Sequence, residues 1–128
     1  MSGKDNRCDL LIGHFLTDEE IEMVKEEFNI KDIDELTYSK TIKESEFKSK
    51  YPSIELFKYN TERDEEEEDA TNYDVIVGYN LMSFPEDINA GIDYCEIEEV
   101  NQIVIKIKED INKLLKKEIK VKILLVAD

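Results

Sequence analysis

The feature that most constrains the fold is a long stretch of helical periodicity near the end of the chain. Between about residues 97 and 117, apolar residues recur at the three- and four-residue spacing that follows one face of a helix. They are Val100, Ile103, Val104, Ile107, Ile111, Leu114 and Leu115. Only an amphipathic helix places all of these side chains on one face. Lysines fill its other faces, and Lys116 and Lys117 suit the negative C-terminal end of a helix dipole. The sequence therefore predicts one long helix here.

Four segments have the character of β-strands. CDLLIGHFL, residues 8–16, is largely apolar on both alternating sides, which predicts a central strand buried on most of both faces. YDVIVGYNLM, residues 73–82, alternates in the same way and predicts a second strong strand. SIELFKY at 53–59 and KVKILLVAD at 120–128 complete the set.

A first helix is predicted directly after the first strand. TDEE, residues 17–20, is a capping box in which Thr17 and Glu20 each bind the other's backbone amide. Leu16 and Ile21 occupy the hydrophobic-staple positions, and the apolar stripe continues to about Asn29. Between residues 31 and 51 the pattern is weak and predicts at most one or two short helical turns in an irregular insertion.

The predicted order is βαββαβ, the set of elements of a ferredoxin-like α+β sandwich in which two helices cover one face of a four-stranded sheet. A length of 128 residues fits a single domain with one core. No run approaches the length of a signal sequence or a membrane span, so a cytoplasmic protein is expected.

The negative charge of the chain is unevenly distributed. The segment TERDEEEEDATN, residues 61–72, carries seven carboxylates and one arginine, and we expect it to form a mobile acidic loop. Residues 55–99 contain 15 acidic residues against Lys58 and Arg63, a net charge of −13, whereas residues 100–128 have 4 acidic residues and 7 lysines, a net charge of +3. A chain with a total charge of −15 repels phosphates and anionic lipid, so direct binding to nucleic acid or membranes is disfavoured.

The acidic loop has two interpretations. It is either a solvated loop without a partner, or part of a surface that attracts a basic protein. Tyrosines near the loop favour the second interpretation, because aromatic anchors and steering carboxylates together suit a fast acidic inhibitor. The leading hypothesis is a non-enzymatic binding module of the inhibitor or immunity type that blocks a basic, nucleic-acid-active partner such as a toxin nuclease or a host defence nuclease. The predicted contact residues are Asp64, Glu65, Glu66, Glu67, Glu68, Asp69, Tyr73, Asp74, Tyr79, Glu86, Asp87, Asp93 and Tyr94.

Two alternatives remain open. One is an oligomeric ferredoxin-like domain, a homodimer for example, with a regulatory or small-ligand-binding role. The other is a small enzyme that uses His14, the single histidine, or a cysteine. Cys8 and Cys95 lack the spacing of a zinc motif or a disulfide framework, and no phosphate-binding or metalloprotease motif occurs, so neither a metal nor another cofactor is predicted.

Overall fold

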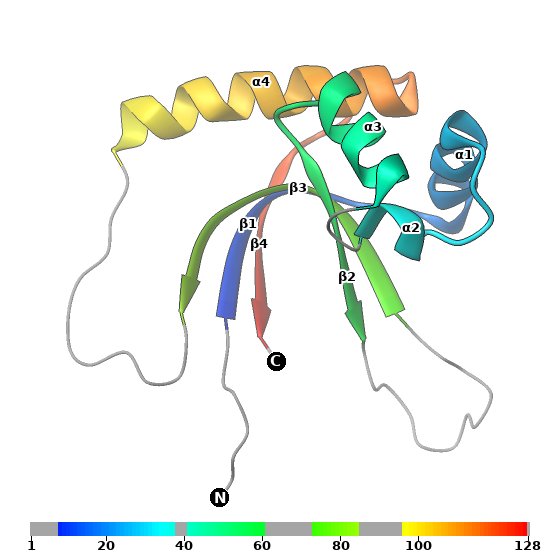
Figure 1. Ribbon diagram of the computed structural model, residues 1–128. Coiled ribbons are helices and arrows are strands. Elements are labelled where there is room, and N and C mark those ends of the chain that lie inside the picture. The colour runs from blue at the N-terminus through cyan, green and yellow to red at the C-terminus, as the bar shows by residue number, and fades with distance from the viewer. Residues whose placement is uncertain (1–7, 38–40, 61–72, 85–95, 128) are drawn as a thin grey trace, which may run out of the picture.

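A four-stranded antiparallel sheet forms the centre of the molecule, and helices pack against it (Figure 1). The structure is a computed structural model that describes residues 8–37, 41–60, 73–84 and 96–127. Its elements are β1 (Cys8–Phe15), α1 (Asp18–Phe28), α2 (Asp34–Thr37), α3 (Ile42–Lys50), β2 (Glu55–Asn60), β3 (Tyr73–Phe84), α4 (Ile97–Leu115) and β4 (Lys122–Ala127). The predicted α+β class with four strands is confirmed, with four helices among the described residues.

The strand order in the sheet is β2-β3-β1-β4, and every neighbouring pair is antiparallel. β1 and β3 are therefore the central strands, and both have sequences that are apolar on both sides. β2 and β4 are the edges. A bulge interrupts the β1–β3 register between Leu10 and Leu11, and a bulge of this kind increases the local bend of a strand.

The predicted capping box starts α1. The Glu20 amide donates to Oγ1 of Thr17 at 3.2 Å, and the Thr17 amide donates to the Glu20 carboxylate at 2.9 Å. The helix ends at Asn29, which adopts the left-handed conformation with φ 55°, a role that asparagine fills better than most residues. Both ends of this helix are thus fixed by its own sequence.

The weakly patterned region between α1 and β2 holds two helices. α2 is a single turn that buries Leu36, and α3 buries Phe47. Thr41 begins α3 by accepting a hydrogen bond from the Glu44 amide at 3.0 Å. Ile42, in the first turn of α3, is 79% exposed, so the helix shows little amphipathic pattern although it forms.

The long predicted helix is α4, which ends at Leu115 because Lys116 turns into the left-handed conformation with φ 59°. Near its end the carboxylate of Asp110 is buried and accepts a hydrogen bond from the Ser53 amide at 3.0 Å, which fixes α4 to the chain just before β2. No helix in the described part of the chain is both long and apolar enough to cross a bilayer.

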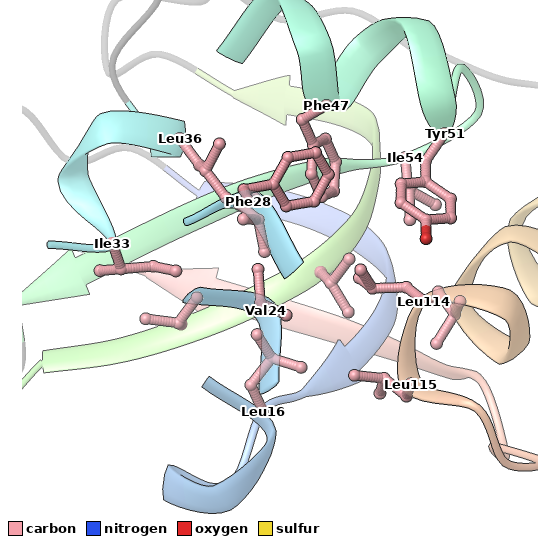
Figure 2. Close-up of a cluster of buried hydrophobic side chains, with 14 of the residues drawn as sticks. Leu16, Val24, Phe28, Ile33, Leu36, Phe47, Tyr51, Ile54, Leu114 and Leu115 are labelled. Carbon is pink, nitrogen blue, oxygen red and sulfur yellow. The ribbon is translucent and has the colours of Figure 1, made fainter. Parts of the chain in front are cut away.

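All four helices share one apolar core with the sheet. Figure 2 shows Phe28 of α1 beside Phe47 of α3, with Leu114 and Leu115 of α4 close by. The rings of Phe28 and Phe47 lie 5.4 Å apart between centroids, and Tyr51 lies 5.4 Å from Phe47. These aromatic contacts join α3 to α1, so the irregular insertion is part of the core.

Candidate functional site

The sheet has two faces, and the helices cover one of them. Ile12, Val75 and Val77 belong to the core that the helices share. Successive residues of a strand point to opposite faces, so Leu11 and Ile76 lie on the other face. Both are fully buried, with 0% and 1% of their surface exposed, yet neither belongs to the helix-covered core. This second face therefore buries side chains of its own.

A hydrogen bond across the second face accounts for this burial. The hydroxyl of Tyr59 on β2 donates to Oδ2 of Asp9 on β1 at 3.1 Å. Tyr59 pairs with Asp74 at one end of β3, and Asp9 pairs with Ser83 at the other end. The nine positions between Asp74 and Ser83 span about 30 Å in an extended strand, much more than a tyrosine side chain reaches. The sheet is therefore strongly curved, as the bowed strands of Figure 1 show, and we call the side bridged by Tyr59 and Asp9 the concave face.

Two glycines stand opposite each other on the concave face, where the two central strands bend. Gly13 of β1 pairs with Gly78 of β3. A Cβ atom at Gly13 would lie 2.2 Å from the Val77 carbonyl oxygen, and one at Gly78 would lie 2.2 Å from the Ile12 carbonyl oxygen. Backbone atoms at such distances leave no room for a methyl group, so close approach of the two strands requires glycine at both positions.

A chain of polar side chains extends from Asp9 along the concave face. Ser83 Oγ donates to Oδ1 of Asp9 at 2.7 Å, and Asn80 Nδ2 donates to Ser83 Oγ at 2.8 Å. Because the serine has one hydroxyl proton, which goes to the carboxylate, Asn80 must turn its NH₂ group toward the serine. Its carbonyl oxygen, Oδ1, is then left buried without a hydrogen-bond partner. An unsatisfied buried acceptor of this kind is uncommon in folded proteins.

The concave face combines aromatic rings with carboxylates. From the strand registers, its residues are Asp9, Leu11, Phe15, Glu55, Phe57, Tyr59, Asp74, Ile76, Asn80, Ser83, Lys122, Leu124 and Val126. Phe15 is 46% exposed there. The set contains three carboxylates and one base, Lys122, which lies on the edge strand β4. The carboxylate of Glu55 is paired with Lys48 of α3, with 3.6 Å between Oε2 and Nζ. Lys58 of β2 lies on the other face, where its Nζ donates to Asp34 Oδ1 at 2.8 Å.

Only some of the predicted contact residues lie in the part of the chain that the structure describes. Asp74 lies on the concave face and is half-buried, whereas Tyr79 pairs with Ile12 and so lies on the helix-covered face, 36% exposed. Tyr73 begins β3 opposite Asn60. The others, Asp64, Glu65, Glu66, Glu67, Glu68, Asp69, Glu86, Asp87, Asp93 and Tyr94, lie outside the described residues. Segment 61–72 joins the sheet at the Tyr73 end of β3 and segment 85–95 at the Phe84 end, so the two acidic segments are attached at opposite ends of one strand.

Sequence reasoning missed Asp9, Phe15, Asn80 and Ser83 as candidate site residues. The alternation in β1 already separates Asp9, Leu11, Gly13 and Phe15 from the core-facing positions. What the sequence does not contain is the contact between Tyr59 and Asp9, 50 positions apart, which gathers these residues on one concave surface.

His14, the candidate catalytic residue, is engaged in an ion-pair cluster. Its Nε2 lies 2.9 Å from Oε1 of Glu20, and Lys117 after α4 donates to Oε2 of the same carboxylate at 2.8 Å. Burial acts to raise the pKa of Glu20, but the hydrogen bonds from Lys117, the Thr17 amide and His14 outweigh it and lower the pKa to about 2. The cluster fastens the first turn of α1 to β1 and to the end of α4.

An open cavity of about 550 Å³ lies between α1, the end of α3 and the end of α4. Its lining includes Lys50, Lys113 and Lys116. The hydroxyl of Tyr51 donates to Oε2 of Glu27 at 2.6 Å, and Lys50 donates to the same oxygen at 2.7 Å. Burial, and then the bond to Glu27, raise the pKa of Tyr51. Glu27 thus binds both Lys50 and Tyr51, so this part of the cavity wall joins α1 to the end of α3.

Within the described ranges, no group of three histidine, cysteine or acidic side chains is placed to hold a metal ion. Cys8 is a half-buried free thiol, and Cys95 lies outside the described residues.

Comparisons of the chain with protein-family models, with curated proteins and with solved structures found no match.

Proposed function

We propose that this protein is a non-enzymatic binding module of the inhibitor type that blocks a basic, nucleic-acid-active protein partner. The observation that carries the proposal is the union of aromatic rings and carboxylates on the concave face. Phe15, Phe57 and Tyr59 share this face with Asp9, Glu55 and Asp74. Arginine and lysine side chains of a partner find both a carboxylate and a ring face there.

The distribution of charge supports a basic partner. About half of the concave face comes from β2 and β3, which belong to the third of the chain with net charge −13. The acidic segments 61–72 and 85–95 continue from the two ends of β3. Carboxylates in this arrangement steer a cationic surface toward the concave face and accelerate its association, while rings fixed by the sheet provide the contact area. In this proposal, the acidic contact residues predicted from the sequence act by steering.

The fold proposal is the ferredoxin-like sandwich. The order of sheet neighbours, with β1 and β3 in the centre, supports it, as does the placement of α1 and α4 on one face of the sheet. The segments LIGHF and IVGYN pair with each other about Gly13 and Gly78, which is the relation expected of two similar halves. The insertion of α2 and α3 after α1 is then an addition to this plan.

The test is affinity capture from cells that naturally make the protein, at 0.05 M and 0.5 M NaCl, followed by purification of each captured protein. We expect a basic nuclease, and we expect the purified module to inhibit its cleavage of DNA or RNA in proportion to the amount added. Binding should weaken strongly at 0.5 M NaCl, because exposed charges lose their reach as the Debye length falls from about 10 Å at 0.1 M toward about 3 Å at 1 M.

Two variants of equal net charge distinguish an effect of the acidic segment 61–72 on binding from an effect of the total charge of the protein. One replaces Asp64, Glu65, Glu66, Glu67, Glu68 and Asp69 by their amides; the control replaces six exposed acids on the helices, Glu19, Glu22, Glu26, Glu35, Glu46 and Glu109, by glutamine. We expect the first variant to raise the Kd at least about tenfold at low salt and the control to change it much less.

Binding that does not depend on salt, or an equal loss in both six-residue variants, would contradict the proposal. Phe15→Ser tests the concave face itself, because this ring is exposed and its replacement should weaken binding without unfolding the domain. An inhibitor whose potency is unchanged by Phe15→Ser would use another surface.

A further inference from the structure

The outer edge of the sheet, β4, exposes two large aliphatic side chains. Ile123 is 71% exposed and Leu125 is 67% exposed. β4 is hydrogen-bonded to β1 on one side, and no strand of the described chain pairs with its other side. Natural proteins protect such edges with short strands, charges or prolines because a bare apolar edge pairs readily with another chain. β4 has no such protection along Ile123 to Ala127.

The faces of β4 are known from its register with β1. Ile123 pairs with Ile12, and Leu125 pairs with Leu10, so both exposed side chains project to the helix-covered side of the sheet. Lys122, Leu124 and Val126 project to the concave side. A strand that pairs with this edge must therefore present apolar side chains on the helix-covered side. On the concave side it must present groups that are complementary to Lys122.

From this edge we propose that β4 pairs antiparallel with β4 of a second copy of the chain, with Leu124 opposite Leu124 on the twofold axis. This register places Ile123 of each copy opposite Leu125 of the other, so all four exposed aliphatic side chains meet on one face. Each Lys122 then lies opposite Val126 of the other copy. Within that other copy, Val126 pairs with Asp9 of β1. The lysine can extend over Val126 to the carboxylate of Asp9, which Tyr59 and Ser83 already orient.

Net charge opposes a second copy least at this edge. The chain has a net charge of −15, so two copies repel each other overall, but residues 100–128 carry a net charge of only +3 and repel the same segment of a second copy more weakly than the acidic parts of the chain do. β4 and its one lysine, Lys122, belong to that segment, so this edge is where two copies approach with least repulsion and where Lys122 and Asp9 are complementary. The result is a continuous sheet of eight strands.

The assembly is tested by sedimentation velocity over a range of protein concentration at 0.05, 0.15 and 0.5 M NaCl. We expect a monomer–dimer equilibrium in which the dimer fraction rises with salt, because screening weakens the repulsion between two acidic copies. Binding of a basic partner changes with salt in the opposite direction, so failure of one proposal is distinguishable from failure of the other. A chain that stays monomeric at every salt concentration overturns the dimer.

Substitutions locate the interface. Leu125→Lys should raise the dimer dissociation constant at least about a hundredfold, because it places charge in the apolar contact and between like-charged copies, and Lys122→Glu should raise it about tenfold by opposing Asp9. Ile42→Lys, at an equally exposed isoleucine on α3, is the matched control and should leave the dissociation constant unchanged. A dimer that Leu125→Lys leaves intact uses another surface and overturns the proposal.

The register is tested by cross-linking. In a chain with Cys8 and Cys95 replaced by serine, Leu124→Cys should form a disulfide-linked dimer under mild oxidation, because facing residues of antiparallel strands lie at a separation that a disulfide spans. Ile105→Cys, on an exposed position of α4, is the control and should remain a thiol monomer. Equal cross-linking of both variants would indicate random collision and overturn the register.

Discussion

The hydroxyl of Tyr59 and the carboxylate of Asp9 form a hydrogen bond of 3.1 Å between opposite ends of the same sheet. This contact requires the four strands to curve toward each other on the side of the sheet that none of the described helices covers. The curvature buries Leu11 and Ile76 outside the main core. A small chain thus buries apolar side chains on both faces of its sheet and gains a concave surface.

Removing the hydroxyl should loosen this curvature. We expect Tyr59→Phe to lower the free energy of unfolding by about 2 kcal/mol, since a hydrogen bond to a charged group contributes more than a neutral one. Urea denaturation followed by circular dichroism measures the change. Tyr79→Phe, at a partly exposed tyrosine on the other face, is the control and should stay within about 0.5 kcal/mol of the wild type. Equal stability of Tyr59→Phe and the wild type would show that the bond does not hold the sheet.

The glycine pair should tolerate no side chain. We expect Gly13→Ala or Gly78→Ala to destabilise the protein by about 3 kcal/mol, because the new methyl group meets backbone atoms that cannot move aside without shifting a strand. Thermal denaturation of both variants measures this effect. Ala127→Val adds bulk at the exposed end of β4 and should be nearly neutral; a comparable loss there, or no loss at either glycine, would contradict the close approach of the strands.

The sequence predicted elements whose signals are local and repeated. α4 has an apolar face over five turns, α1 has a complete capping box, and β1 and β3 are apolar on alternate sides. The region of α3 predicts at most one or two short helical turns, because its exposed Ile42 and single buried Phe47 give no periodic stripe. The cap at Thr41 was the local signal that could have located it.

The concave face was beyond prediction for a different reason. The sequence indicated correctly that β1 is buried on both sides, but it contains no local sign of what covers the second side. The second side is buried because the sheet curves. The curvature depends on the pairing of Gly13 with Gly78 and on the hydrogen bond between Tyr59 and Asp9. These pairs are 65 and 50 positions apart, and nothing in either segment alone specifies the partner.

α3 belongs to the core in spite of its weak pattern, and this can be measured. Phe47 is 1% exposed and contacts the rings of Phe28 and Tyr51. We expect Phe47→Ala to lower the free energy of unfolding by about 4 kcal/mol, through lost burial and the cavity left behind. Ile42→Ala in the same helix is the control and should change it by less than about 0.5 kcal/mol. Chemical denaturation that gives similar values for the two variants would place α3 outside the core.

The charge of Glu20 should make stability depend on pH. Its pKa is 4.5 in a model peptide and about 2 in the folded protein, so its charged form stabilises the fold above pH 4.5, and this contribution is lost as the pH falls toward 2. Glu20→Gln keeps the capping-box geometry but removes the charge that Lys117 and His14 bind. We expect the wild type to exceed Glu20→Gln by about 3 kcal/mol at pH 7 and by less than about half of that at pH 3. Urea denaturation at each pH measures the difference, with Glu22→Gln on the exposed side of α1 as the control. A difference that stays constant from pH 7 to pH 3 would mean that the carboxylate is not held by these partners.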